Sequence, residues 1–511
     1  MNSPASLPKH LKKMIDPAFY PHEVDNITLS DTHISWIIFT GKFVYKIKKP
    51  LDLGFLDFST LAKRKHYCEE ELRLNQRFAP DYYLSVEPIL EAGKVIEYAV
   101  KMRQFPENQL LSQLAAKGAL TVQHIDQIAT SIAQIHQSLP QANTSSTYGQ
   151  ASDVFSAAVD NFTVLKQLTS QKDDLTKMER IENWTTNFTQ TQRALFEKRL
   201  REGFIRECHG DLHLANITLI DQSPVIFDCI EFNESFRWID TLSDLAFLIM
   251  DLHYYQQPEL ARRLLNLYLE LTGDYAGLKM LRFYLVYRAM VRCKVEAIHH
   301  SQSPQQNSAA RYQTYLDLAL SWLKPQNPKL MITYGFSGSG KSFISQVLVE
   351  NSESIRIRSD VERKRLFGLS VLEQSTPKLK SQMYSSHASQ QTYQRLSLLA
   401  SELIDAGYST IIDATFLSRQ PRQHFQQLAK ELRVPFIILH THAPVSLLRK
   451  WIKERALGNK DASEATVEVL EKQILHHDPL DKKELIYTVE FNTENPITPQ
   501  EILDKIHTIN E

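Results

Sequence analysis

Gly335-Phe-Ser-Gly-Ser-Gly-Lys341-Ser342 is the stretch that decides the fold of the C-terminal part of this chain. It has the Walker A spacing G-x-x-x-x-G-K-[ST], in which glycines let backbone N–H groups turn toward phosphate oxygens. A strand-like run at 330–334 precedes it and a helical run at 342–350 follows, as the motif requires. We therefore expect Lys341 to bind and activate a triphosphate, and the Ser342 hydroxyl to bind Mg²⁺. The other phosphate contacts are expected from Gly335, Ser337, Gly338, Ser339 and Gly340.

Strand-like and helical runs alternate after this motif and shortly before it. Apolar strand-like runs at 329–334, 354–358, 409–412 and 435–440 are separated by helical patterns. Such alternation predicts an α/β domain with a parallel sheet covered by helices. Lys324–Pro328 is the best linker, because its two prolines break helical structure. We expect one domain over residues 1–325 and a second over residues 326–511.

Charged residues near the ends of these strands are candidates for catalysis and substrate binding. Asp413 ends a strand at the edge where open α/β sheets bind ligands, so it is expected to hold Mg²⁺ through water or to accept a proton, unless it only caps a helix. Asp360 and Arg363 are expected to bind the acceptor, or else to form a helix cap and a solvated face. Arg449 and Arg455 fit either a lid that contacts the phosphoryl group or a plain surface helix.

This C-terminal pattern resembles the small P-loop kinases of the gluconate kinase, polynucleotide kinase and zeta-toxin type. The resemblance implies a P-loop NTPase fold, ATP as the phosphoryl donor, Mg²⁺ as cofactor and a small acceptor. The sequence has no guanine-selecting N-K-x-D motif and no arginine-rich second region of the AAA+ type. An ATP kinase is therefore favoured over a GTPase or a remodelling ATPase.

A second group of polar residues precedes the linker, in Cys208-His209-Gly-Asp211-Leu-His-Leu-Ala-Asn216. Two strand-like runs follow, at 217–220 and 225–228, with a turn between them. Antiparallel pairing of these runs would bring Asn216 and Asp228 to one end of a hairpin, where their oxygens suit Mg²⁺. Asp211 stays on the preceding loop, where it is able to accept a proton from an attacking hydroxyl.

This H-x-D-x-x-x-x-N arrangement resembles the catalytic loop of the aminoglycoside phosphotransferase and choline kinase branch of kinase-like enzymes. The resemblance implies a protein-kinase-like, two-lobed α+β domain that phosphorylates a small-molecule hydroxyl with ATP. In it Asp211 is the catalytic base and His209 is structural. Asp240 and Asp244, which follow shortly after, are expected to cap and brace a helix.

The same resemblance implies a lysine on the third strand that binds ATP, and a glutamate on the next helix that pairs with it. Lys46 fits best because apolar residues flank it, whereas Lys48 begins a cluster that looks solvated. Glu71 is expected to face inward on its helix, with Glu70 as the fallback. A solvated acidic helix face is the alternative for both glutamates.

Composition narrows the classes of function. Lys plus Arg total 58 against 59 for Asp plus Glu, so no overall field favours nucleic acid or a membrane. No uncharged apolar run approaches the ~18 residues of a membrane span. The four cysteines form no C-x-x-C pair, which argues against a zinc site or a disulfide framework. Together with the lack of a secretory signal pattern, this predicts a cytoplasmic protein.

The leading hypothesis is a multidomain, bifunctional kinase, in which both domains transfer a phosphoryl group from ATP to separate small acceptors. The alternative is a P-loop ATPase or kinase regulated by a catalytically weak kinase-like sensing domain, because 29–35 stands in place of a glycine-rich loop but contains no glycine. A nucleic-acid end kinase, with basic residues at 356–365 on phosphates, is disfavoured by the neutral charge. The order of domains also resembles fused bacterial proteins with an aminoglycoside-phosphotransferase-like half and an ATPase-like half. The acceptors, the coupling of the two sites and the oligomeric state stay open.

Overall fold

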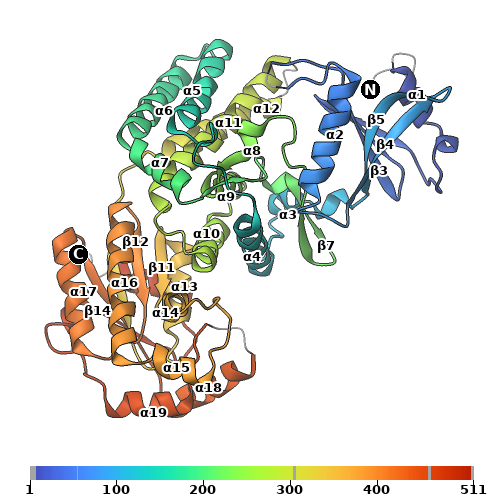
Figure 1. Ribbon diagram of the computed structural model, residues 1–511. Helices are drawn as coiled ribbons and strands as arrows, with labels where there is room; N and C mark the ends of the chain where they lie inside the picture. The colour runs from blue at the N-terminus through green and yellow to red at the C-terminus, as the bar shows by residue number, and fades with distance from the viewer. Residues whose placement is uncertain (1–6, 55, 303–305, 459–461, 508–511) are drawn as a thin grey trace. The chain divides into compact units, whose positions relative to one another are not determined.

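The computed structural model describes residues 7–54, 56–302, 306–458 and 462–507 (Figure 1). Its internal contacts divide the chain into two compact units. Unit 1 comprises the described residues up to Gln256 together with Phe283–Leu320, and unit 2 comprises Gln257–Arg282 together with the described residues from Ser321 onward. Among the described helices, none has the length and apolar content that a bilayer crossing requires.

The first lobe of unit 1 is a five-stranded antiparallel sheet in the order β1-β2-β3-β5-β4. The strands are β1 (Thr28–Asp31), β2 (Ser35–Phe39), β3 (Phe43–Lys48), β4 (Tyr83–Glu91) and β5 (Lys94–Arg103). Helix α2 (Leu61–Asn75) begins after Thr60, whose side chain accepts a hydrogen bond from the Lys63 N–H, and it packs against β4 and β5. Because β3 lies in the middle of the sheet and most of its residues are buried, its polar side chains face packed structure and not water.

The second lobe of unit 1 is mainly helical. Twelve consecutive residues of helix α9 (Thr241–Tyr254) are buried, from Thr241 to Leu252, as expected for a helix that is apolar on nearly all sides. The other helices are α3 (Leu111–Ala116), α4 (Val122–Ser138), α5 (Ala151–Leu168), α6 (Lys172–Thr191), α7 (Arg193–Arg201), α8 (Glu234–Arg237), α11 (Leu278–Gln302, whose first residues belong to unit 2) and α12 (Gln306–Ser321). A small helix α1 (Lys9–Met14) belongs to the first lobe.

Two short strand pairs complete the second lobe: β6 (Ile205–Glu207) with β9 (Trp238–Asp240), and β7 (Ile217–Ile220) with β8 (Ser223–Ile226). The predicted hairpin is present, but its second strand begins at Ser223, two positions before the predicted start. The reason is a two-residue turn, since Asp221 and Gln222 adopt φ values of 48° and 64°. Such turns match the twist of antiparallel strands, so Ser223 and Pro224 can join the ladder.

Unit 2 is built on a five-stranded parallel sheet in the order β11-β12-β10-β13-β14. The strands are β10 (Leu330–Tyr334), β11 (Ser354–Arg358), β12 (Ser409–Asp413), β13 (Phe436–His442) and β14 (Thr488–Asn492). The helices are α10 (Pro258–Thr272), α13 (Lys341–Asn351), α14 (Ser359–Leu366), α15 (Pro377–Met383), α16 (Ser386–Asp405), α17 (Arg419–Leu432), α18 (Val445–Gly458), α19 (Val467–Leu475) and α20 (Pro499–His507). The predicted fold class, a kinase-like α+β domain and then an α/β domain with a parallel sheet, is confirmed.

The sheet of unit 2 determines where a ligand can bind. Its first strand in the chain, β10, lies between β12 and β13 in the middle of the sheet, so the connections leave β10 in opposite directions. Open α/β sheets bind ligands at such a switch point, outside the carboxyl ends of the strands. The phosphate-binding motif follows β10 directly and therefore lies at this edge.

The two units are not separated at a single point in the sequence. The sequence-based boundary near residue 325 lies close to Ser321, where the long segment of unit 2 begins. Unit 2 also takes in Gln257–Arg282, because α10 packs against α13 and β11.

Candidate functional sites

The phosphate-binding loop joins β10 to α13 in a conformation that only glycine fits. A Cβ on Gly335 would lie 2.4 Å from the Thr441 carbonyl oxygen, and Gly338 and Gly340 have φ values of 82° and 84°. Lys341, the first residue of α13, is buried and its Nζ donates hydrogen bonds to the carbonyls of Gly335 (3.0 Å) and Phe336 (2.7 Å). Burial lowers the pKa of Lys341 to about 8.

Ser342 and Asp413 meet at the edge of the sheet. The Ser342 hydroxyl donates a hydrogen bond of 2.8 Å to Oδ2 of Asp413, which ends β12 beside β10. Both residues offer oxygen atoms, the donor type that Mg²⁺ prefers. Asp413 does not cap the following helix, α17, whose N-cap residue is Ser418.

A cavity of about 580 Å³ opens next to the phosphate-binding loop. Asp360, Arg363, Asp413 and Arg455, which the sequence placed in this site, all line it, as do the loop residues from Ser337 to Ser342. Arg449 is placed differently: it is outside the cavity lining, its side chain is 46% exposed, and its Nε lies 2.7 Å from the Glu471 carboxylate. Helix α18 turns Arg455 toward the cavity and leaves Arg449 in solvent, a difference that sequence spacing alone did not resolve.

Several cavity residues were missed from the sequence because they come from helices and loops distant from the glycine loop in the chain and belong to no motif. They include Lys380, Tyr384, Tyr393, Trp451, Glu464 and Gln473. The Gln473 side chain fastens the phosphate-binding loop, since its Oε1 accepts from the Ser337 N–H at 2.9 Å and its Nε2 donates to the Ser337 hydroxyl at 3.1 Å. Burial raises the pKa of Tyr384, and the neighbouring Asp360 carboxylate raises it further.

In unit 1 the two lysines of β3 lie in one network of buried charges. Lys46 Nζ is 2.5 Å from Asp228 Oδ1 and 2.9 Å from Glu71 Oε1, so the lysine and glutamate expected from the sequence are paired. The expectation that Lys48 is solvated is wrong, because its side chain is fully buried and contacts Glu71 at 2.7 Å and also Glu231. Lys46 and Lys48 share one strand face by the two-residue period, and both reach Glu71 of α2 from that face.

The pKa values in this network follow from pairing. Burial acts to lower the pKa of Lys46, but Asp228 and Glu71 raise it well above the usual lysine range. Burial likewise acts to raise the pKa of Glu71, but the two lysines hold it below its usual range. Lys46 and Glu71 therefore stay charged at neutral pH.

The catalytic-loop residues gather around the β7–β8 hairpin. The Phe227 N–H donates to the Asn216 carbonyl at 3.0 Å, which places Asn216 next to Asp228 at one end of the hairpin. Asn216 Nδ2 also donates to Asp211, at 3.0 Å to its carbonyl and 3.2 Å to Oδ2. The side chains of Asp211 and Asp228 are 37% and 43% exposed, so both carboxylates are accessible from solvent.

His213, which was not predicted from the sequence, contacts Asp211. Its Nε2 lies 3.3 Å from Asp211 Oδ2. Burial would raise the pKa of Asp211, but the His213 imidazolium holds it below its usual range. The same contact raises the pKa of His213 against the effect of burial. The sequence feature that could have identified His213 is its position two residues after Asp211 in the same loop.

Buried carboxylates of α9 fix the backbone of this loop. Asp244 accepts from the N–H groups of His209 (3.0 Å) and Gly210 (2.9 Å), and Asp251 accepts from that of Leu214 (2.8 Å). Asp240 caps α9 by accepting from the Leu242 N–H at 2.9 Å. His209 is buried, with Nε2 2.8 Å from the Phe227 carbonyl, in a position that suits a structural role.

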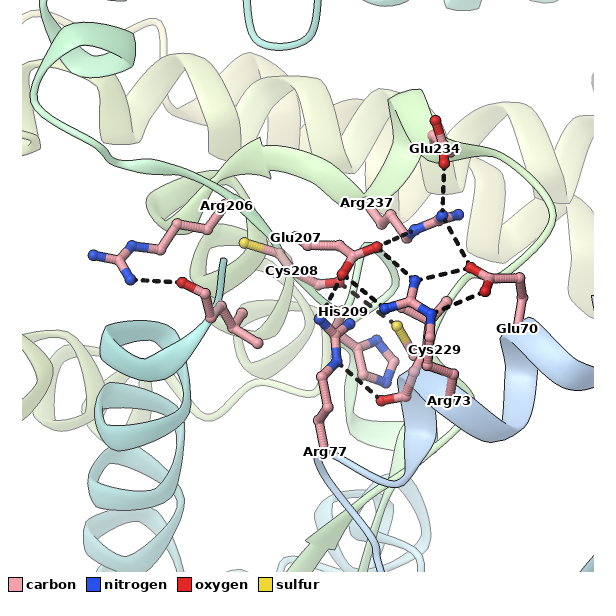
Figure 2. Close-up of polar contacts among 12 residues, drawn as sticks. Glu70, Arg73, Arg77, Arg206, Glu207, Cys208, His209, Cys229, Glu234 and Arg237 are labelled. Carbon is pink, nitrogen blue, oxygen red and sulfur yellow. Dashed lines mark hydrogen bonds and ion pairs between the residues drawn. The ribbon is translucent and has the colours of Figure 1, made fainter. Parts of the chain in front are cut away.

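Glu207, just before the catalytic loop, is the centre of a second ionic network (Figure 2). Its carboxylate contacts Arg73 in the last turn of α2 (2.8 Å) and Arg77 just after that helix (2.8 Å). It also contacts Arg237 of α8 (3.1 Å). Glu70 pairs with Arg73 at 2.8 Å, so it lies in this network and not beside Lys46. The network ties the helix that carries Glu71 to the strand that leads into the catalytic loop.

Comparisons with known proteins match two different family models to two separate parts of the chain. A model of the phosphotransferase enzyme family matches residues 63–281, and a model of an AAA domain matches residues 330–480. Uncharacterized proteins of Mycobacterium tuberculosis (strain H37Rv) and Mycobacterium bovis are each 30% identical over 438 residues, which cover 86% of this chain and 88% of theirs.

Two solved structures are also similar to this chain, both at low sequence identity. A choline/ethanolamine kinase family protein from Mesorhizobium loti is 12% identical with a TM-score of 0.41, covering 62% of this chain and 93% of that one. A sugar kinase from Janibacter sp. is 18% identical with a TM-score of 0.27, covering 36% of this chain and 94% of that one.

The buried position of Lys341 predicts a pH-dependent uptake of protons on nucleotide binding. Its pKa of about 8 means that the neutral form predominates above that pH, whereas a bound triphosphate stabilises the charged form. Binding at pH 8 should therefore take up about half a proton at this residue, and nucleotide affinity should fall as the pH rises further. Calorimetry in buffers of different ionisation enthalpy measures the uptake. Uptake that persists in Lys341→Met, or that is the same at pH 6 and pH 8, would contradict the assignment.

The Glu207 network predicts a large loss of stability in unit 1 when its central charge is removed. Glu207→Gln leaves three arginines short of a carboxylate at a side chain that is 5% exposed, so we expect a loss of about 3 kcal/mol. Glu234→Gln removes a 56% exposed partner of Arg237 and should cost less than about 1 kcal/mol. Hydrogen exchange of the α2 amides measures both. Equal effects of the two variants would show that Glu207 is not the centre of the network.

Proposed function

This chain belongs to the same family as the mycobacterial proteins, with a phosphotransferase enzyme family domain followed by an AAA domain, and from this premise we propose that it transfers phosphoryl groups from ATP at two separate sites. The observation that carries the proposal is the same in both units. A buried lysine lies beside a carboxylate and a second oxygen donor, at Lys46, Asp228 and Asn216 in unit 1 and at Lys341, Asp413 and Ser342 in unit 2. A lysine for phosphate and oxygen ligands for Mg²⁺ are what phosphoryl transfer requires.

In unit 1, Asn216 and Asp228 would hold Mg²⁺, whose charge neutralises the phosphates when it is bound. Lys46 would contact the phosphates while Glu71 holds its ammonium group in place. Asp211, kept ionised by His213, would accept the proton of an acceptor hydroxyl. Its accessible carboxylate suits a small molecule as acceptor.

In unit 2, Lys341 and the backbone of the glycine loop would hold the phosphates, and Ser342 with Asp413 would hold Mg²⁺. The contact between Ser342 and Asp413 supports the metal-binding role of Asp413 over the proton-accepting one. Asp360 is then a carboxylate in the cavity that can accept the proton, with Arg363 to orient the acceptor and Arg455 to contact the phosphoryl group.

One feature of unit 1 favours the second candidate function, a nucleotide sensor with little turnover. The turn between β1 and β2 contains no glycine, and its backbone is engaged internally: the Thr32 N–H donates to the Ser35 carbonyl (3.0 Å) and the Ser35 N–H to the Thr32 hydroxyl (3.0 Å). These N–H groups are then not available to phosphate. In that case unit 1 would regulate the P-loop site.

We further propose that the protein works in the cytoplasm on small metabolites. All four cysteines are buried free thiols, which suits a reducing compartment. The supporting evidence for small acceptors is the size of the cavity in unit 2 and the accessible Asp211 in unit 1.

The test is to incubate the purified protein with labelled ATP and a metabolite extract and to identify the phosphorylated products. Asp211→Asn should abolish one set of products and Lys341→Ala another, each by about 10²-fold or more, because each change removes a group that acts directly on the reactants. Asp221→Asn, in the hairpin turn, and Lys430→Ala, at the exposed end of α17, are matched controls that should leave both sets unchanged.

The outcomes separate the two candidates. If Asp211→Asn changes no product while Lys341→Ala removes all of them, unit 1 is a sensor. If neither variant changes turnover, neither site is catalytic.

A further inference from the structure

Helix α10 belongs to unit 2, although its sequence lies in the region matched by the phosphotransferase model and well before the region matched by the AAA model. We propose that Glu270, near the end of α10, is a positioning residue for phosphoryl transfer in unit 2, where it holds Arg358 away from Asp360. The proposal rests on the proposed function of unit 2.

The contact of α10 with the sheet is specific because α10 supplies hydrogen-bond partners to the backbone of an edge strand. Strand β11 is at one edge of the parallel sheet, where unpaired backbone groups need partners. Asn266 Oδ1 accepts from the Arg356 N–H at 2.8 Å, and its Nδ2 donates to the Ser354 carbonyl at 3.3 Å. Arg263 adds an ion pair of 2.5 Å to Glu350 of α13. One side of α10 is therefore fitted to β11 and α13.

The Glu270 carboxylate is 2% exposed and serves two arginines of β11. Its Oε1 accepts from Arg356 Nε (2.9 Å) and Nη2 (2.7 Å), and its Oε2 lies 3.8 Å from Arg358 Nη1. Arg356 and Arg358 extend from the same strand face by the two-residue period. A carboxylate supplied by α10 thus compensates two positive charges that the sheet would otherwise bury at high cost.

Both arginines also lie at the phosphate site. Arg356 Nη1 donates to the Ser342 carbonyl at 3.3 Å, which connects Glu270 to the residue that follows the phosphate-binding lysine. Arg358 lines the cavity together with Asp360. With Glu270 in place, the Arg358 guanidinium has a carboxylate partner at the cavity wall, and Asp360, which is hydrogen-bonded to Tyr384, does not have to supply one.

Loss of the Glu270 charge should therefore have opposite effects on binding and on turnover. The Arg358 guanidinium would turn toward other anions, namely the nucleotide phosphates and Asp360. Nucleotide would bind more tightly because the site gains one positive charge, whereas turnover would fall because Asp360 is paired. A residue that only stabilises the fold would weaken both together.

The experiment uses the full chain with Glu270→Gln, and calorimetry with a non-hydrolysable ATP analogue and Mg²⁺. The binding component that Lys341→Ala removes is that of unit 2. We expect Glu270→Gln to tighten this component about three- to tenfold. It should also lower the formation of the products that depend on Lys341 by at least about tenfold.

Three further variants isolate the cause. Glu259→Gln, at an exposed position of the same helix, removes the same charge and should change neither measurement. Asn266→Ala should lower the unfolding temperature of unit 2 without tightening nucleotide binding. Arg358→Ala combined with Glu270→Gln should return nucleotide affinity to that of the unaltered chain, because the tighter binding acts through Arg358.

The outcomes also separate this proposal from the function it rests on. If the unaltered chain has no binding component that depends on Lys341, the proposed function of unit 2 fails. If that component is present but Glu270→Gln leaves it unchanged, or weakens it while lowering the unfolding temperature of unit 2, the positioning role is overturned.

Discussion

A charge can be buried in a protein only when an opposite charge and hydrogen bonds are buried with it, and this constraint shapes both candidate sites. Lys46 and Lys48 are buried in the first lobe because Glu71, Asp228 and Glu231 surround them. These carboxylates come from α2 and from the segment after the β7–β8 hairpin. The ion pairs can therefore form only when the two lobes of unit 1 are packed against each other. The ion pairs that offset the cost of burying the lysines also bring Asp228, a candidate metal ligand, next to Lys46, the candidate phosphate-binding residue.

The Glu207 and Asp244 carboxylates extend this constraint to the backbone of the catalytic loop. Glu207 is held by three arginines from α2, the turn after it and α8, whereas Asp244 accepts two backbone N–H groups of the loop itself. Asp251 accepts the Leu214 N–H on the other side of Asp211, so carboxylates outside the proposed reacting groups fix the backbone both before and after this residue. Preorganisation of this kind lets a small number of exposed groups act without moving at the moment of reaction.

Unit 2 reaches a comparable result by a different route. Its phosphate-binding loop depends on backbone geometry, because the glycines permit turns that a Cβ would block, and on the switch point of a parallel sheet. Buried charge enters through Lys341 and through Glu270 with Arg356. The participation of α10 means that the functional unit is larger than the segment in which the sequence motif occurs.

The sequence by itself predicted the fold classes, the glycine loop after β10, and the residues that gather around the β7–β8 hairpin, because each of these depends on local spacing: period two in strands, glycine where the backbone must turn, and a short loop between Asp211 and Asn216. It also favoured Lys46 and Glu71, which the structure pairs. Only the tertiary structure decided the burial of Lys48, the solvent position of Arg449, the roles of Glu207 and His213, and the membership of α10 in unit 2. These features depend on partners that are distant in the chain or on which side of a helix faces a neighbour, and local residue patterns carry no record of either.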